Sequence, residues 1–222
     1  MAIAENGPGG NHIGRLGNLV YYMLNGKNVS RSIGESTDPS TPAQKKSRLE
    51  TSMSSAFFSR TLDFLRTGFG IEAAKARDNA FNMAVKCNKK KMFKGTYPDL
   101  QIAYDQVMVS TGTLKSASNW QVSPGSDGLY YSWETHPEMP WPEATDQVMM
   151  LAYFPVKEKV YFKLFGNNRL AGNDVLEIPP SLQHAYMETY VAFISADRKQ
   201  VSDSIYTGNF NSDLPVDPLL IS

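Results

Sequence analysis

The spacing of the apolar residues changes along this chain of 222 residues, and the change comes near Lys94. Before that point apolar side chains recur at helical spacing, as in Leu49, Met53 and Phe57. Beyond Lys94 the period becomes two, which is typical of β-strands. A run of helices followed by a run of strands predicts a fold of the α+β class.

Two helices are expected in the first half of the chain. Thr41 suits a helix N-cap and Pro42 suits the first helical position. Gln44 completes a capping box three residues after Thr41, and the helix is predicted to run to about Arg66. Glycines within residues 67–70 are expected to end it in left-handed caps. A second helix predicted over about residues 73–91 would complete an αα-hairpin.

A β-hairpin is expected ahead of these helices. Residues 19–23 and 29–33 predict its two strands, and Asn25-Gly26 predicts the turn because both residues tolerate positive φ. Residues 1–13 are polar and Gly-rich and are expected to form an extended arm. The hairpin and the helices would then make one domain over residues 14–112.

The rest of the chain is predicted to be a β-sandwich. Seven short strands are expected, at residues 119–123, 128–134, 147–154, 159–165, 174–178, 186–195 and 202–208. This number and spacing predict an immunoglobulin- or fibronectin-like β-sandwich over residues 113–210, followed by a tail over 211–222. Its aromatic core is expected to contain Trp120, Trp133, Tyr153, Tyr190 and Phe193. The single cysteine, Cys87, excludes the inter-sheet disulfide of antibody domains.

The charge of the chain is unevenly divided, although the formal net charge is zero. Residues 1–100 contain 15 basic and 8 acidic residues, whereas residues 101–222 contain 7 and 14. Such asymmetry favours either an anionic partner for the first half or head-to-tail packing between copies, and two solvated surfaces are the alternative. No apolar run approaches the length of a membrane helix, and residues 1–11 lack the features of a signal peptide, so we expect neither.

No catalytic constellation is evident. His12, His136 and His184 lie far apart and have no metal-ligand spacing. Gly14-Arg15-Leu16-Gly17 precedes a predicted strand instead of opening a helix, so it lacks the context of a phosphate-binding loop. The sequence therefore predicts a protein that is not an enzyme and needs no metal, cofactor or small-molecule substrate.

Two sets of residues are candidates for contacts with partners. The first is a basic set at the end of the second helix, which consists of Lys86, Lys89, Lys90, Lys91 and Lys94. These lysines could contact nucleic-acid phosphates, and Phe93 and Tyr97 beside them could stack on bases. The alternative is that they form a solvated helix end. An interface set has two parts. The first part consists of small or polar residues near the hairpin, where glycines would allow another backbone to approach closely. The second part is the apolar end of the tail, which would either dock on a partner or be a frayed terminus. Its members are Gly14, Gly17, Asn18, Arg31, Leu219, Leu220 and Ile221.

Several motifs over residues 14–208 resemble a family of uncharacterised proteins from Bacteroidetes and from phages that infect them, including crAss-like phages. The motifs are Gly14-x-x-Gly17-Asn18-Leu19-Val20, Gly26-Lys27-Asn28-Val29-x-Arg31, Thr41-Pro42-Ala43-Gln44 with Arg48, Ala80-Phe81-Asn82, Lys94-Gly95-x-Tyr97-Pro98, Ala192-Phe193-x-Ser195-Ala196-Asp197 and Val201-Ser202-x-Ser204-x-Tyr206. The stretch 136–142 and the tail after Phe210 depart from this pattern and suggest a specialised partner.

The resemblance implies a structural role in a virion that is assembled in the host cytoplasm. The leading hypothesis is a ring or decoration component of the neck or tail, with copies of itself and other virion proteins as partners and with no membrane. One alternative is an intracellular nucleic-acid-associated protein that uses Lys86–Lys94. Another is a carbohydrate- or surface-binding module with Trp141 and Trp133 as platforms, although Trp133 lies mid-strand and suits the core better.

Overall fold

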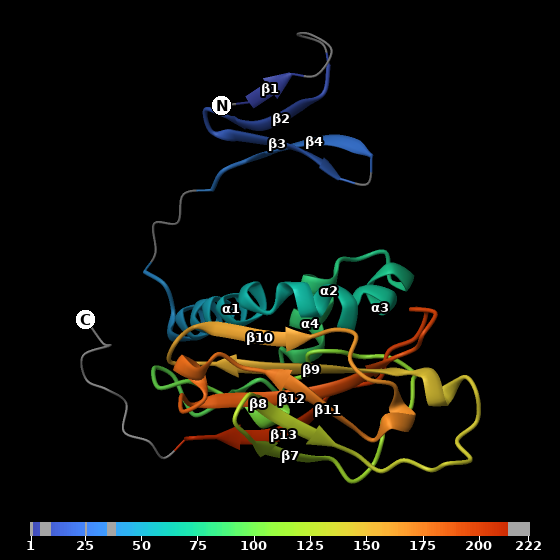
Figure 1. Ribbon diagram of the computed structural model, residues 1–222. Helices are drawn as coiled ribbons and strands as arrows, with labels where there is room; N and C mark the ends of the chain where they lie inside the picture. Colours follow the sequence, from blue (N-terminus) through green and yellow to red (C-terminus); the bar gives the residue numbers. More distant parts are fainter. Residues whose placement is uncertain (1, 5–9, 25, 35–38, 213–222) are drawn as a thin grey trace. The chain divides into compact units, whose positions relative to one another are not determined.

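The computed structural model describes residues 2–4, 10–24, 26–34 and 39–212 (Figure 1). The chain divides into two compact units, Met1–Pro42 and Ala43–Ser222. This division differs from the boundary expected at residue 112. The described part is a mixed α and β structure that is mostly β, with four α-helices and several antiparallel sheets. No helix within the described ranges is long and apolar enough to span a membrane.

The first unit is a four-stranded antiparallel sheet. Its strands are β1 (Ala2–Ala4), β2 (His12–Leu16), β3 (Leu19–Leu24) and β4 (Lys27–Ser32), paired in chain order. Strands β3 and β4 confirm the predicted hairpin, and Gly26 in its turn has φ 77°; Asn25 lies outside the described residues. Ala2–Ala4 pairs with residues 12–14, where an extended arm was expected. An isolated two-stranded hairpin is only marginally stable in water. Strands β1 and β2 add backbone hydrogen bonds to this hairpin and so help to stabilise it.

The helical segment contains four helices instead of two. They are α1 (Pro42–Arg60), α2 (Leu62–Gly68), α3 (Gly70–Lys75) and α4 (Ala80–Asn88). The predicted start at Pro42 is confirmed, but the predicted helix over 73–91 is wrong, because it is interrupted before Asn79. The Asn79 side chain caps α4 by accepting a hydrogen bond of 2.8 Å from the Asn82 amide.

Gly68 and Gly70 do not form the left-handed caps that the sequence predicts, since neither has a positive φ. Gly68 instead permits a close approach. A Cβ at this position would lie 2.5 Å from the Val109 carbonyl oxygen and 2.7 Å from Ser110 Cβ, whereas a Cβ on Gly70 would meet nothing within 4 Å. Gly68 therefore packs α2 directly against the segment that leads into the two larger sheets.

Short elements connect the helices to the seven main strands. Strands β5 (Phe93–Lys94) and β6 (Gln101–Ile102) pair with each other, and the 3-10 turn η1 (Tyr104–Gln106) follows. Residues 107–109 form a loop. Val109 donates its amide to Ser204 Oγ at 2.9 Å, so this loop is held by the last strand region of the chain.

All seven strands predicted for the second half are present. They are β7 (Gln121–Pro124), β8 (Gly128–Ser132), β9 (Gln147–Phe154), β10 (Lys159–Lys163), β11 (Asn173–Glu177), β12 (Met187–Ile194) and β13 (Ile205–Phe210). One sheet has the order β10-β9-β12-β13 and the other the order β11-β8-β7. Three 3-10 turns lie in the segments that connect these strands along the chain: η2 (Glu143–Thr145), η3 (Arg169–Ala171) and η4 (Pro180–Leu182).

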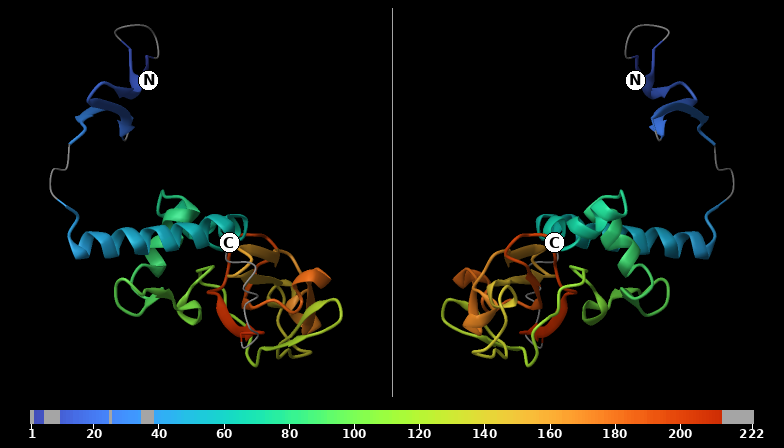
Figure 2. Two further views of the ribbon diagram at one scale, coloured as in Figure 1. Left: turned by 90° about the vertical axis from the view of Figure 1, so that its left-hand side faces the viewer. Right: turned by 90° about the vertical axis from the view of Figure 1, so that its right-hand side faces the viewer.

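The four-stranded sheet is buried on both faces. The helices cover one face and the three-stranded sheet lies on the other (Figures 1 and 2). Along β9, Met149, Leu151 and Tyr153 pack toward the helices, while Val148 and Met150 pack toward the second sheet. This explains why β9 is a continuous apolar run, as expected for a strand without a solvent face.

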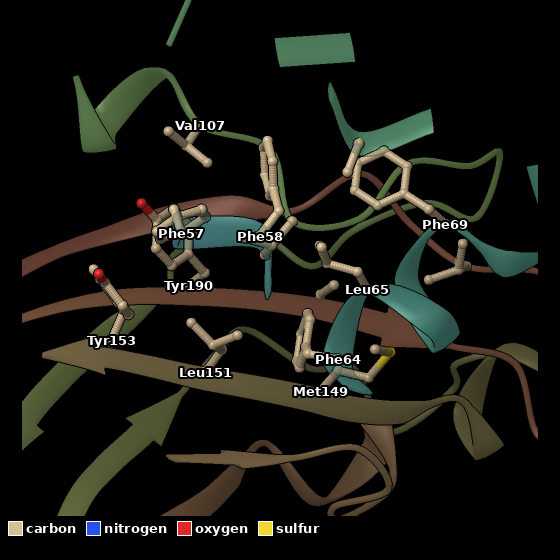
Figure 3. Packing of buried hydrophobic residues seen from close by; sticks show 14 of the residues in the cluster. Phe57, Phe58, Phe64, Leu65, Phe69, Val107, Met149, Leu151, Tyr153 and Tyr190 are labelled. Carbon is tan, nitrogen blue, oxygen red and sulfur yellow. The ribbon is translucent and has the colours of Figure 1, made fainter. Parts of the chain in front are cut away.

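The helix-side core contains two tyrosines that were expected in the sandwich core. Tyr153 and Tyr190 lie with Phe57, Phe58 and the other aromatic residues of α1 and α2 (Figure 3). Trp133 and Phe193 lie between the two sheets as predicted, with half-buried Trp120 packed against them. Because helices and sheet share one core, residues 43–212 form one unit and the predicted separation of a helical domain from a sandwich domain is not observed.

Candidate interaction surfaces

The N-terminal sheet has two faces of different character. Opposite residues in paired strands project to the same side, and the register places Arg15, Val20 and Arg31 side by side. The face that contains them combines apolar side chains with three basic ones, and we name it the basic-rimmed face. Its members are Ile13, Arg15, Val20, Tyr22, Leu24, Lys27, Val29 and Arg31. The opposite face holds His12, Leu16, Leu19, Tyr21, Met23, Asn28, Ser30 and Ser32.

The N-terminal sheet lacks a buried core of its own. Within residues 10–24 and 26–34, no described side chain is in the buried class. Large apolar side chains are instead open to solvent: Ile13 at 41%, Leu16 at 59%, Leu19 at 39%, Met23 at 41% and Leu24 at 51%. Apolar side chains gathered at this density on a small sheet are typical of a contact surface.

The predicted interface residues have varied roles. Gly17 has φ 59°, so the turn between β2 and β3 uses a backbone conformation that favours glycine. A Cβ at Gly17 would meet nothing within 4 Å, so this glycine does not serve a close approach of another segment. Asn18 accepts the Ile33 amide through its backbone carbonyl at 2.7 Å. Gly14 lies within β2 with φ 112°, and exposed Arg31 lies on the basic-rimmed face. Leu219, Leu220 and Ile221 fall outside the described residues.

The members of the predicted basic set lie in different local environments. Lys86 pairs with Asp78, whose pKa is lowered to about 2 mainly by this hydrogen bond and also by those from Asn82 and Asn79. Lys89, Lys90 and Lys91 are exposed at the end of α4 and in the turn that follows. Lys94 lies on β5 and lines a separate pocket. Tyr97 is 39% exposed, but Phe93 packs against the helix-side core, which removes one of the two expected stacking residues.

A pocket of about 560 Å³ lies beside Trp141, in the Pro-rich stretch that the sequence marks as particular to this chain. Trp141 is 80% exposed, and Trp133 is 5% exposed in the core, as expected from its place in a strand. The floor of the pocket contains a buried ion pair, in which Arg169 Nη2 lies 2.9 Å from Asp146 Oδ2.

The ion pair is held by several contacts. Arg169 Nη2 also donates to the Lys115 carbonyl at 2.5 Å, and its guanidinium lies 4.1 Å from the centroid of the Phe193 ring. Its Nε has no hydrogen-bond partner within the described part of the protein. Burial raises the pKa of Asp146, and the nearby Arg169 charge opposes that rise. Sequence reasoning missed this pair because its members are 23 residues apart in ordinary loop sequence.

The histidines do not converge on a site. His12 lies on β2 beside Tyr21, with ring centroids 5.4 Å apart, and His136 and His184 are exposed in other loops. In the described ranges no group of three or more His, Cys, Asp and Glu side chains could hold a metal ion. Burial raises the pKa of the half-buried Cys87 thiol, which disfavours its reactive thiolate form.

These features define a two-unit protein, with a four-stranded sheet in the first unit and a helix-covered pair of sheets in the second. A family model matches residues 10–208, and the chain therefore belongs to DUF6266, a family of unknown function. The match includes β2 to β4 of the first unit, the helices and the strands of the second unit as far as Gly208 in β13. The predicted membership of an uncharacterised family is thus confirmed, whereas the Bacteroidetes or phage origin stays a prediction. No curated protein and no solved structure matches the chain.

Proposed function

We propose that this protein is a structural component of a phage virion, which assembles with copies of itself into a ring or decoration of the neck or tail. The observation that supports assembly best is the basic-rimmed face, which places exposed Ile13 and Leu24 beside three basic side chains. The resemblance of several sequence motifs to a family from Bacteroidetes and their phages is the reason for proposing a location in a virion.

The occupant of the basic-rimmed face would be a second copy of this chain. Residues 10–34 contain three basic residues and no acidic one, whereas residues 101–212 contain 7 basic and 12 acidic residues. A basic surface on one copy is therefore complementary in charge to the acidic half of the next copy. Contacts between two different surfaces are heterologous, and they generate a ring when the rotation closes.

The sheet pair would be an immunoglobulin- or fibronectin-like sandwich. Of its seven strands, the first, second and fifth form one sheet, and the third, fourth, sixth and seventh form the other. This division supports a fibronectin-like arrangement, to which the helices on the outer face of the larger sheet would be an addition. Such a module would serve as the rigid body that the N-terminal sheet links to its neighbour.

Two matched substitutions test the proposed interface. We expect the wild-type protein to form a discrete oligomer that dissociates at high salt, because the contact is partly electrostatic. Ile13→Asp places a charge on the basic-rimmed face and is expected to give a monomer. Leu19→Asp, on the opposite face and similarly exposed (39% against 41%), is expected to leave the oligomer intact. Light scattering at two salt concentrations measures the mass of each.

A wild-type monomer at every concentration and salt would sink self-assembly through this sheet, as would an equal effect of the two substitutions. The virion assignment has its own test, which is mass spectrometry of purified particles from a phage that encodes the protein. The chain should be present at a fixed copy number per particle, and its absence would contradict the assignment.

A second candidate function is carbohydrate binding at the Trp141 pocket, favoured by the 80% exposure of this indole beside buried polar groups. Trp141→Ala is expected to weaken binding on a glycan array by at least about tenfold, since aromatic anchors dominate such contacts. Leu170→Ala, exposed but outside the pocket lining, is the control. Equal signals from the wild-type protein and Trp141→Ala would rule this candidate out.

A further inference from the structure

A second pocket, of about 630 Å³, lies on the helix side of the four-stranded sheet. Tyr186, Glu188 and Tyr206 contribute from the sheet region, and Lys94, Tyr104 and Asp105 from the segment between α4 and the sandwich. The pocket is therefore built where the helical part and the sheet part of one unit meet. It combines three phenols, two carboxylates and one ammonium group.

Glu188 is the unusual residue of this pocket. It lies in β12, in which every residue is buried and the others are neutral, and it is itself 2% exposed. Tyr186 donates its hydroxyl to one carboxylate oxygen, and Tyr206 donates to the other at 2.6 Å. The Tyr190 hydroxyl beside them is used elsewhere, since it donates to the Tyr104 carbonyl at 2.8 Å. The carboxylate is thus held in place by two phenols.

No Lys, Arg or His nitrogen among the described residues forms a direct ion pair with Glu188, although Lys94 lines the same pocket. Burial raises the pKa of Glu188, and the hydrogen bonds from Tyr186 and Tyr206 and the charge of Lys94 oppose that rise. Burial also raises the pKa of Tyr186 and Tyr206, so both phenols remain protonated donors at neutral pH. With Lys94 and Asp105 included, the charged side chains that line the pocket sum to one negative charge.

We propose that this pocket binds an organic ammonium ion, whose charged group contacts the Glu188 carboxylate and whose alkyl part lies among Tyr104, Tyr186 and Tyr206. A buried carboxylate without a counter-ion is costly, and a bound cation offsets that cost. Aromatic walls favour an alkylammonium ion over a small hydrated cation. Two carboxylates and neutral phenols also fall short of the six or more oxygen ligands typical of calcium sites.

Calorimetric titration of the full chain with cadaverine, choline and Nα-acetyl-lysine amide tests the proposal. We expect at least one of these probes to bind, and Glu188→Gln to weaken that binding about 10- to 100-fold, as for the loss of a charge-assisted hydrogen bond. Glu177→Gln, an exposed position on β11, is the matched control and is expected to bind like the wild-type protein.

A second variant keeps the proposal testable if Glu188→Gln fails to fold. Lys94→Met, at an exposed position, removes the only cation that lines the described pocket and is expected to tighten binding several-fold. Binding should also weaken as the pH falls and Glu188 becomes protonated. The groups that surround Glu188 are Tyr104, Tyr186, Tyr190, Tyr206, Lys94 and Asp105.

The same variants distinguish two possible sources of the ammonium group, a lysine of a neighbouring copy and a free amine. If it belongs to a lysine of a neighbouring copy, Glu188→Gln will also lower the mass of the oligomer in light scattering; if it belongs to a free amine, the mass will be unchanged. Absence of heat from all three probes, or equal affinity in the wild-type protein, Glu188→Gln and Lys94→Met, would overturn the proposal.

Discussion

Arg169→Ala is expected to lower the free energy of unfolding by about 3–5 kcal/mol, because it leaves the buried Asp146 carboxylate without its partner. Asp146 is 3% exposed and Arg169 is 1% exposed, so both charges are largely withdrawn from water in the folded protein. The Lys115 carbonyl loses a donor and the Phe193 ring loses the cation above it. Urea denaturation of both proteins at neutral pH measures the difference.

Arg198 provides a control of the same residue type. Its guanidinium also lies over a phenylalanine ring, 4.0 Å from the centroid of Phe165, but the residue is exposed. Arg198→Ala is therefore expected to cost less than about 1 kcal/mol. The double variant Asp146→Asn/Arg169→Leu should recover part of the loss, since neither charge remains buried. If Arg169→Ala were as mild as Arg198→Ala, the pair would not be a structural ion pair.

The sequence allowed the seven strands to be predicted but not the face to which each side chain projects. Strand β9 is apolar at nearly every position, so its pattern identifies a buried strand and carries no information on which residues meet the helices. The placement of Tyr153 and Tyr190 between the sheets was wrong for this reason. The face of the sheet on which Tyr153 and Tyr190 lie depends on where the helices pack. The local sequence pattern of a strand does not show where the helices pack.

The roles of single loop residues were equally hidden from the sequence. Gly68 ends α2, as the sequence predicts, but it has no positive φ, and it also allows the close approach of Val109, 41 positions later. Arg169 similarly resembles an ordinary loop residue. Glu188, in contrast, carried a usable signal, because a carboxylate within an otherwise neutral buried strand demands a specific environment.

Phe57→Ala is expected to lower the free energy of unfolding by about 3–5 kcal/mol, as is typical when a buried phenylalanine is truncated. The Phe57 side chain is 1% exposed and attaches α1 to the sheet (Figure 3). Its ring packs edge-on against Tyr153 of β9 with centroids 4.8 Å apart, and it also contacts Phe58 and Tyr104. Phe165→Ala, at a position that is 49% exposed, is expected to cost less than about 1 kcal/mol.

The shape of the unfolding curve distinguishes the two possible domain divisions. If residues 14–112 and 113–210 were separate domains, Phe57→Ala would shift only one of two transitions and leave that of the sandwich unchanged. Because Phe57, Tyr153 and Tyr190 belong to a single core, we expect residues 43–212 to unfold in one cooperative step that shifts as a whole. Tryptophan fluorescence reports on the sheet pair, where Trp120 and Trp133 lie between the sheets, and far-ultraviolet circular dichroism at 222 nm reports on the helices. We expect the two signals to show the same transition and Phe57→Ala to shift both by the same amount. A shift of the circular dichroism transition without a shift of the fluorescence transition would support the two-domain division instead.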